Sequence, residues 1–280
     1  MSIPNLGYRF AFWQGNATRG TYRALLPWII RQPIEPPRTI DLDVFAYSNE
    51  EMLPEQVASI RSFLRHAGRP QSFTVVSDGS HSPGSIRLLE ALDPAVKVRL
   101  ADPVPPTLPE KLRHYLAEHP TGKQLALVMS LPLAARALYV DSDVRFFPGA
   151  SDFTEQVGRC EAPAYYLADC QFSGDERLLR SPAEADKPVN TGALLLLQKL
   201  DWSLSIARFE ELAGPPSFFT NQTMVHLTMH ANGALPFDPR THVLQLDDQA
   251  VYPDRYAGPE LVFRHYVNPV RHKMWTSLRS

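Results

Sequence analysis

Two aspartates one residue apart, Asp141 and Asp143, directly follow the apolar run Ala137 to Val140. The run is typical of a buried strand. Because burying unpaired charge is costly, we expect both carboxylates at the open carboxyl end of that strand. Carboxylate oxygens are the ligands that Mg²⁺ and Mn²⁺ take, often together with substrate phosphates. The segment therefore indicates a metal-held phosphate ligand, although an aspartate at a strand end also often bonds its own backbone in a turn.

A later segment gathers imidazole and cationic side chains: His265, Arg271, His272 and Lys273, followed by Trp275. Imidazole suits Mn²⁺ or Zn²⁺, and an arginine or lysine beside it can hold a phosphate. The alternative is a solvated basic segment, but the interleaved aromatic side chains are unusual for one. His265 and His272 are thus both candidates for a third metal ligand.

Two polar segments between these regions can also contact a ligand. Asn190 and Gly192 precede an apolar strand, and a short amide followed by glycine allows close approach of a ligand to the backbone. Asn221 and Gln222 open a predicted helix with Thr220 as its cap. These amides either face a substrate or satisfy the end of the helix.

The elements that must position these residues alternate between strand and helix in the first half of the chain. Strands are predicted at 42–47, 72–77, 96–101 and from 137, and helices at 53–64, 86–92, from about 111 and from about 123, the last broken near Pro132. This alternation predicts an α/β fold with a mainly parallel central sheet flanked by helices. The second half is more mixed, with strands at 164–169, 192–198 and 261–266 and a helix at 221–230.

In an open parallel sheet, ligands collect beyond the carboxyl ends of the strands. Tyr47 and Ser48 lie at the end of one predicted strand, and Asp78 follows another. We therefore expect all three residues at the same edge of the sheet as Asp141. Tyr47 can stack on a base and Asp78 can accept hydrogen bonds from one. The ordinary interpretations are a core-edge tyrosine and an Asp-Gly turn.

Composition narrows the function classes. The 280 residues carry a net charge of −2, without the basic footprint of a general nucleic-acid binder. No apolar run approaches the ~20 residues of a membrane span, and residues 1–20 lack the order of a secretory signal. We expect a cytoplasmic protein, either free or peripheral to a membrane. Its two cysteines, Cys160 and Cys170, are expected as reduced thiols.

Four short motifs, taken in order, resemble those of the GT-A glycosyltransferases over about residues 42–275. They are D-S-D, N-T-G before an apolar strand, N-Q opening a helix, and H-Y followed by R-H-K-M-W. The resemblance is closest to the metal-dependent retaining group that includes glycogenin and bacterial lipopolysaccharide galactosyltransferases. It implies a Rossmann-like domain that transfers a sugar, most often a hexose, from a UDP-sugar held on Mn²⁺ or Mg²⁺. The acceptor is a saccharide, lipid, protein or small molecule. We expect a single domain over 1–280, with an extension at 1–39, a nucleotide-binding half at 40–147 and an acceptor-side half at 148–280.

The resemblance also implies roles for individual residues. Asp141, Asp143 and His265 match the metal ligands, and Gln222 and Asp169 match residues beside the reacting sugar. Donor contacts are expected at Ala46, Tyr47, Ser48, Asp78, Lys123, Ser142, Asn190, Gly192, Asn268, Arg271 and Lys273.

The sequence departs from the usual patterns of this group. Asn221 replaces an aspartate, Asn268 replaces a glycine and Arg271 replaces a lysine, so stereochemistry stays open. An inverting reaction would need a carboxylate base, with Asp247, Asp248 and Asp254 as candidates.

Rival functions also remain. One is a HAD-type phosphatase with Asp247-Asp248 as its acidic pair, although Arg145 stands where that motif has Thr or Val. Another is a non-catalytic nucleotide-sugar-binding module. The pair His226 and His230 is interpreted as two ordinary helix residues, because Leu227 stands where a zinc protease has glutamate. Residues 9–30 are interpreted as an extra strand, a lid or a docking element.

Overall fold

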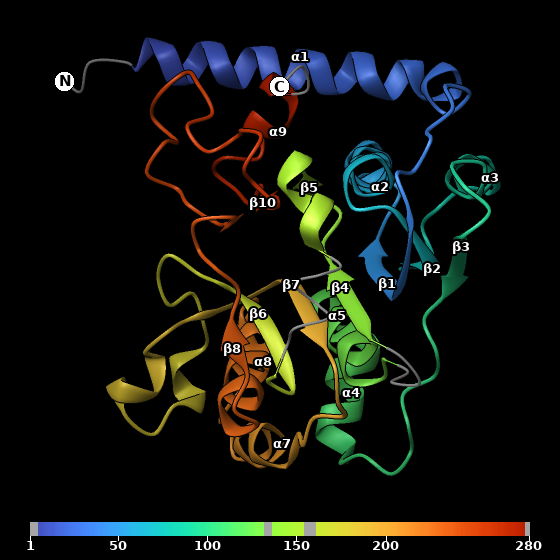
Figure 1. The fold of residues 1–280 in the computed structure, drawn as a ribbon. Helices are drawn as coiled ribbons and strands as arrows, with labels where there is room; N and C mark the ends of the chain where they lie inside the picture. The colour runs from blue at the N-terminus through green and yellow to red at the C-terminus, as the bar shows by residue number, and fades with distance from the viewer. Residues whose placement is uncertain (1–4, 132–135, 154–160, 278–280) are drawn as a thin grey trace.

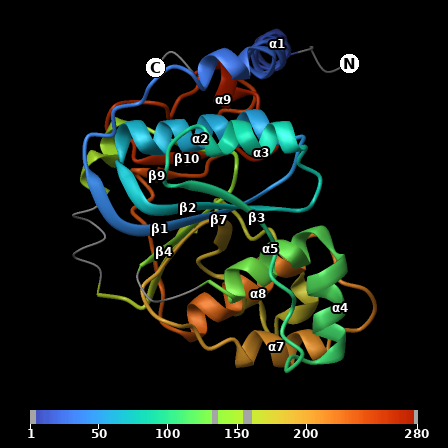
Figure 2. The same cartoon turned by 90° about the vertical axis from the view of Figure 1, so that its right-hand side faces the viewer.

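The structure, a computed structural model, describes residues 5–131, 136–153 and 161–277. A seven-stranded sheet lies between two layers of helices (Figures 1 and 2). One face is covered by α2 (Leu53–His66) and α3 (Pro83–Glu90). The other is covered by α4 (Glu110–Glu118), α5 (Pro120–Met129), α7 (Ser203–Glu210) and α8 (Thr220–Ala231). Short 3₁₀ helices lie at Pro148–Asp152, Glu176–Leu178 and Pro182–Ala185.

The large sheet has the strand order β3-β2-β1-β4-β7-β6-β8. Its strands are β1 (Thr39–Ser48), β2 (Arg69–Ser77), β3 (Val96–Leu100), β4 (Ala137–Val140), β6 (Ala164–Ala168), β7 (Val189–Leu196) and β8 (Leu235–Pro236). All neighbouring pairs are parallel except those of β7, which runs antiparallel to both β4 and β6. The predicted mainly parallel α/β sheet is confirmed. The reversal of β7 brings its first residues to the edge where β4 and β6 end.

A second sheet of three strands, in the order β5-β10-β9, lies beside the first. Its strands are β5 (Val144–Phe146), β9 (His242–Val243) and β10 (Phe263–His265). β10 pairs antiparallel with β5, which follows the two aspartates directly. This sheet therefore connects the end of β4 with a segment more than a hundred residues later in the chain.

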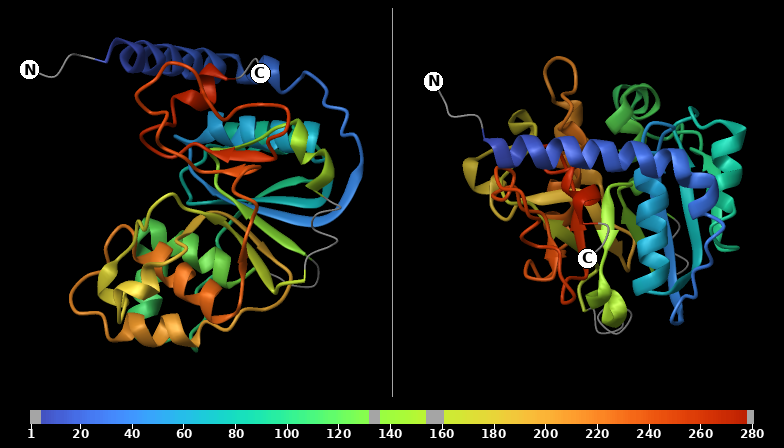
Figure 3. Two further views of the ribbon diagram at one scale, coloured as in Figure 1. Left: turned by 60° about the vertical axis from the view of Figure 1, so that its left-hand side comes forward. Right: turned by 90° about the horizontal axis from the view of Figure 1, so that it is seen from above.

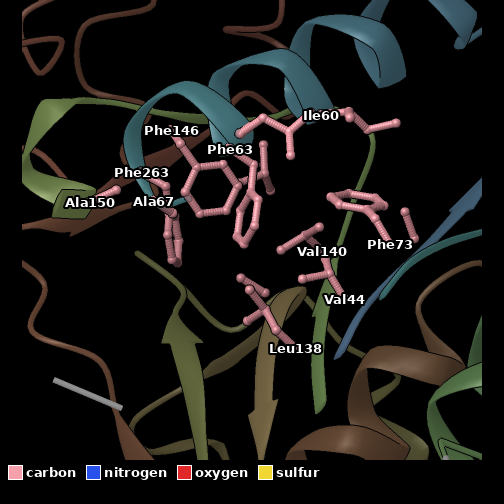
Figure 4. Packing of buried hydrophobic residues seen from close by; sticks show 14 of the residues in the cluster. Val44, Ile60, Phe63, Ala67, Phe73, Leu138, Val140, Phe146, Ala150 and Phe263 are labelled. Atoms are coloured by element: carbon pink, nitrogen blue, oxygen red, sulfur yellow. The ribbon is translucent and has the colours of Figure 1, made fainter. Parts of the chain in front are cut away.

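The core on the α2 side explains why these segments fold as they do. Val57, Ile60 and Leu64 recur at helical spacing and are fully buried in α2. Figure 4 shows Phe63, Phe146 and Phe263 packed together between α2 and the strands. The rings of Phe63 and Phe146 meet edge to face with centroids 4.9 Å apart, the geometry that aromatic pairs prefer. The residues that flank the metal candidates in sequence are thus anchored in the core.

The N-terminal segment is a 24-residue helix, α1 (Leu6–Ile29), so the predicted extra strand is wrong. Asn5 caps it by accepting a hydrogen bond from the Tyr8 amide, and Pro27 lies in its last turn. The helix crosses the top of the molecule in Figure 1 and packs on α9 (Lys273–Thr276) and α2. Along the parts of the chain that are described, no helix is long and apolar enough to cross a membrane.

Several smaller expectations also changed. The helix predicted from about Lys123 begins at Pro120 and ends at Met129, and Pro132 lies outside the described residues. Thr220 is the first residue of α8 and not its cap. Its hydroxyl instead accepts from the Ser217 amide and donates to Asp175. Cys170 is a free thiol, and Cys160 lies outside the described residues.

Candidate metal and donor site

Three strand ends meet at one edge of the large sheet. Asp141 follows β4, Asp169 follows β6, and Asn190 is the second residue of the reversed strand β7. The Asp141 amide donates to the Gly192 carbonyl (2.8 Å), and the Asp169 amide donates to the Pro188 carbonyl (2.8 Å). Backbone hydrogen bonds therefore fix the spacing of three polar side chains far apart in sequence.

The second sheet adds His265 to this edge. In the β5–β10 register His265 lies opposite Val144, and the Tyr266 amide donates to the Asp143 carbonyl (3.0 Å). His265 Nε2 consequently lies 3.0 Å from Asp143 Oδ1 and 3.4 Å from Asp141 Oδ2. These three residues form the one group with metal-ligand geometry within residues 5–131, 136–153 and 161–277.

Asn190 and Gly192 hold the imidazole in place. Asn190 Oδ1 lies 2.9 Å from His265 Nδ1 and also accepts from the Gly192 amide at 2.8 Å. An amide oxygen can only accept, so Nδ1 carries the proton. A Cβ on Gly192 would lie 2.1 Å from ring atoms of His265, so only glycine leaves room for the ring. The close approach expected at this glycine is therefore made by a side chain of the protein itself.

The donor set fits a divalent cation. Ligands at ~2.1 Å from a metal and at right angles to each other are about 3 Å apart, close to the two distances from His265 Nε2. Two carboxylates and one neutral imidazole suit Mn²⁺ better than Mg²⁺, which prefers an all-oxygen shell. The hydrogen bond at Nδ1 is the arrangement that orients a metal-binding histidine.

The charges of the group are strongly coupled. Burial, opposed by His265 and reinforced by Asp143, raises the pKa of Asp141. Burial acts in the same direction on Asp143, but His265 and Arg271 outweigh it and lower the pKa of that carboxyl. For His265, burial is outweighed by the two carboxylates, which raise its pKa. A cation bound here would take the place of the imidazolium proton.

A second polar cluster lies beside the first. Asp169 Oδ2 accepts from Asn190 Nδ2 (3.0 Å) and Gln222 Nε2 (3.1 Å), and Gln222 Nε2 also donates to the Ser173 carbonyl (2.8 Å). Asn190 thus bonds His265 with one end of its amide and Asp169 with the other. Gln222 Oε1 accepts no hydrogen bond from any described residue, which leaves it available to a ligand.

These clusters line one cavity with a volume of 780 Å³. This volume is in the range of small-molecule sites. Among its lining residues are the predicted Ser142, Asn190, Asn268 and Arg271, together with both aspartates, His265, Asp169 and Gln222. Arg271 lies 2.8 Å from Asp143 Oδ2 and keeps about a third of its side chain exposed, so a cationic group borders the candidate metal site.

Comparison with known proteins relates this arrangement to one fold. No protein-family model and no curated protein matches the sequence. Among solved structures, the galactosyltransferase LgtC in complex with donor and acceptor sugar analogues matches 85% of this chain and 96% of its own, with 13% identity and a TM-score of 0.53. Mouse xyloside xylosyltransferase 1 matches 84% of this chain and 99% of its own, with 16% identity and a TM-score of 0.54. The chain has the fold of the GT-A glycosyltransferases. The bifunctional glycosyltransferase WbbM matches 89% of this chain over 53% of its own length, at 12% identity and a TM-score of 0.55.

Within this GT-A fold, four residues predicted to contact the nucleotide donor lie next to the cavity and not in its wall. Ala46 and Ser48 are buried in β1, Tyr47 is half-buried, and the hydroxyl and amide of Ser80 donate to Asp78. Burial and the charge of Asp78 raise the pKa of Tyr47 to about 12. The cavity wall instead begins one residue after β1, at Asn49.

Lys123 and Lys273 are also outside the cavity wall as far as the structure describes it. Gln124, the residue after Lys123, faces the site. Its Nε2 donates to Asp141 Oδ1 (2.8 Å), and its Oε1 accepts from Asn221 (2.8 Å). Lys273 is fully buried and donates to the carbonyls of Val251 and Pro253, so the structure does not bring it to the cavity.

His272 does not join the candidate metal group. Its ring meets Tyr8 and Phe12 of α1 with centroids 5.5 and 5.7 Å apart, and its backbone packs on Gly15. His226 Nε2 and His230 Nε2 bond the carbonyls of Glu184 and Lys187, consistent with two ordinary histidines.

The candidate bases have structural roles. Asp248 is fully buried and forms two hydrogen bonds with Arg264, at 2.9 and 3.0 Å. Asp254 pairs with the same guanidinium and accepts from Tyr266. Asp247 accepts from the Tyr256 hydroxyl. This ion cluster anchors the strand next to His265, and it does not supply the acidic pair that a HAD-type phosphatase needs.

The sequence interpretation missed three kinds of contact. Tyr139 donates to Asp141 at 2.6 Å, and its alternating position in β4, two residues before Asp141, was the available signal. Gln124 was overlooked in favour of its charged neighbour. Phe218 and Phe219 line the cavity one turn before Gln222, and their adjacency to a predicted helix start was the only hint.

Proposed function

We propose that this protein is a Mn²⁺-dependent glycosyltransferase that uses a nucleotide-sugar donor, with a UDP-sugar as the donor of choice. The observation that carries the proposal is the Asp141–Asp143–His265 group, with its imidazole oriented by Asn190, at the strand edge of a GT-A fold. A divalent cation bound there would supply Lewis-acid stabilisation of a diphosphate leaving group.

The protein's own residues supply the remaining charge and orientation. Arg271 borders the metal group and can donate to the diphosphate oxygens, a preorganised charge that needs no rearrangement during reaction. We place the nucleotide toward Asn49 and Met52, near Tyr47, Ser48 and Asp78, because these lie at the β1 end of the cavity.

Gln222 and Asp169 are proposed to lie beside the reacting sugar. Asp169 receives two amide donors, which hold its carboxylate in one orientation, and Gln222 Oε1 is left for the ligand. An amide oxygen and a carboxylate favour the cationic character that develops at the anomeric carbon. The three candidate bases for inversion are held in other contacts, so we propose retention of configuration. LgtC is also known as an active-site variant in which a glutamine is replaced by glutamate, which is compatible with a role for Gln222.

The decisive experiment compares the wild-type protein with Asp143→Ala. We expect UDP to raise the melting temperature only when Mn²⁺ is present, and UDP-sugar hydrolysis or transfer to disappear in the variant and on chelation. Asp102→Ala, at an exposed aspartate paired with Arg99, is the matched control and should behave as wild type. Activity that survives chelation or Asp143→Ala would refute the proposal.

The same assay separates the rivals. A thermal response to fluoroberyllate alone would favour a phosphatase. Mn²⁺-dependent UDP-sugar binding without turnover, over a broad acceptor panel, would favour a non-catalytic binding module on this fold.

A further inference from the structure

The outward face of α1 is mainly apolar, interrupted by Gly20 and Thr21 in the middle of the helix. Six side chains recur at intervals of three, four or seven residues and so share one side of the helix: Leu6, Phe10, Trp13, Ala17, Ala24 and Trp28. All six are exposed, and the two tryptophans are 66% and 59% exposed. Twelve large apolar side chains are exposed in the described parts of the chain, and half of them belong to this one helix. These are Leu6, Phe10, Phe12, Trp13, Leu25 and Trp28, so the helix also exposes Phe12 and Leu25 beside the row. We call the row Leu6, Phe10, Trp13, Ala17, Ala24 and Trp28 the α1 apolar face.

The opposite side of α1 is fixed to the body of the protein. Ala11, Gly15 and Leu26 are buried, and a Cβ on Gly15 would lie 2.4 Å from the His272 carbonyl oxygen. Arg19 pairs with the buried Glu55. Because one side of the helix is buried and the other exposed, the apolar face is directed away from the rest of the chain. Figure 3 shows α1 lying along the outside of the molecule.

The aromatic part of this face continues onto a neighbouring loop. The ring of Phe10 stacks on Trp13 with centroids 6.1 Å apart and lies 5.5 Å from the ring of Tyr252. Tyr252 is itself 40% exposed, and its hydroxyl bonds Gln14 of α1. Tryptophan and tyrosine, each with an apolar body and a polar tip, are enriched where one side of a surface is apolar and the other is wet.

The charge of α1 has one sign. Its 24 residues include three arginines and no aspartate or glutamate. Arg9 and Arg23 are exposed along the flank of the apolar face, and Arg31 follows the end of the helix. Arg23 approaches Glu50 at 4.0 Å but keeps 42% of its side chain exposed.

We propose that α1 docks the protein on an anionic lipid surface, with the helix lying in the plane of the interface. Aromatic and leucine side chains on one face with arginines beside them are the composition of helices that bind in this way. The charge pattern favours lipid over a second copy of the chain, because two α1 faces packed together would bring arginines toward arginines. This inference does not depend on the proposed transferase activity.

Vesicle flotation tests the proposal. The wild-type protein should float with vesicles of phosphatidylcholine and phosphatidylglycerol, weakly with phosphatidylcholine alone, and less with the anionic vesicles as salt is raised. The double variant Phe10→Ser/Trp13→Ser should lose at least about ten-fold in partitioning, because both rings leave water on docking. Arg9→Glu/Arg23→Glu should lose binding to anionic vesicles specifically.

Leu204→Ser, at an exposed leucine of α7 on the far side of the molecule, is the matched control and should bind as wild type. Equal melting temperatures for all variants would show that they are folded. No flotation of the wild type with anionic vesicles, or equal flotation of the Phe10/Trp13 variant, overturns the proposal. A wild-type dimer in light scattering that the same variant abolishes overturns it in favour of self-association.

Discussion

Replacing Gly192 by alanine tests the site through a single methyl group. Gly192 lies in the fully buried strand β7 and is not among the glycines with positive φ, so alanine suits its backbone. The added Cβ would, however, lie 2.1 Å from Cε1 and Nδ1 of His265. The ring cannot move without losing its contacts with Asn190 and Asp143, because both nitrogens are engaged.

The size of the effect follows from these contacts. Overpacking of a buried site costs about 1–3 kcal/mol, and loss of a charge-assisted hydrogen bond costs about 1.5–3 kcal/mol. At roughly 2–4 °C per kcal/mol for a chain of this size, Gly192→Ala should melt about 5–25 °C lower. Displacing the imidazole should also weaken Mn²⁺ binding by at least the 10- to 100-fold typical for changes around a metal ligand.

Calorimetric titration of Mn²⁺ in the presence of UDP measures the second effect. Gly20→Ala is the control, since a Cβ there has no atom within 4 Å and alanine is the better helix former. If Gly192 acts through the imidazole, adding Gly192→Ala to His265→Ala should cost little further Mn²⁺ affinity. Wild-type Mn²⁺ affinity in Gly192→Ala, or full additivity in the double variant, would refute this reasoning.

Three further predictions concern separate parts of the molecule. Gln222→Ala should lower turnover about 100-fold in initial-rate assays, while titration should show Mn²⁺-dependent UDP binding within a few-fold of wild type. An equal loss of turnover and of UDP binding would contradict the proposed position of Gln222 beside the reacting sugar. Asp175 has its pKa lowered to about 2, because Arg177 and Thr220 outweigh burial. The ionised Asp175 carboxylate should therefore contribute its full stabilisation of the folded state above pH ~4, and this contribution should be lost as pH falls toward 2. Acid unfolding followed by circular dichroism should show that the stability of Asp175→Asn depends less on pH than that of the wild type. The same pH dependence in both proteins would contradict this role of Asp175. Asp248→Ala should lower the free energy of unfolding, measured in urea, by about 3–5 kcal/mol, because it removes an ion-pair partner of the buried Arg264. Asp247→Ala, at the exposed neighbouring aspartate, should lower it by less than about 1 kcal/mol. Similar values for both variants would contradict the assignment of Asp248 to the buried ion cluster.

The sheet and the residues of the candidate metal group could be read from the sequence because their signals are local or periodic. An apolar run ending in two aspartates is one signal, and alternating strand and helix patterns are the other. Strand boundaries still shifted, as in β7, which begins at Val189 and not at Gly192. The direction of β7 could not be read, since a buried strand has the same apolar pattern in either direction.

Individual contacts on helices were less predictable, because one residue along a helix turns the side chain by about 100°. This is why Gln124 and not Lys123 faces Asp141. Arg271, in the turn before α9, reaches Asp143, whereas Lys273, the first residue of α9, is buried with its ammonium 3.6 Å from Asp248. The helical conformation of α1 was missed, although Leu6, Phe10 and Trp13 recur at helical spacing in the sequence.

The pairing of β10 with β5 has a consequence for how the protein is made. His265 reaches aspartates more than 120 residues earlier in the chain, and α1 packs on α9, which comes later still. A chain emerging from the ribosome therefore folds its first four parallel strands long before either contact is possible. Until Phe263–Thr276 has been synthesised, Asp141 and Asp143 lack the positive charge of His265 and Arg271, and α1 lacks α9, the helix on which it packs. Assembly of the candidate metal group and packing of the first helix are therefore both late events of biosynthesis, completed by the same short stretch of polypeptide.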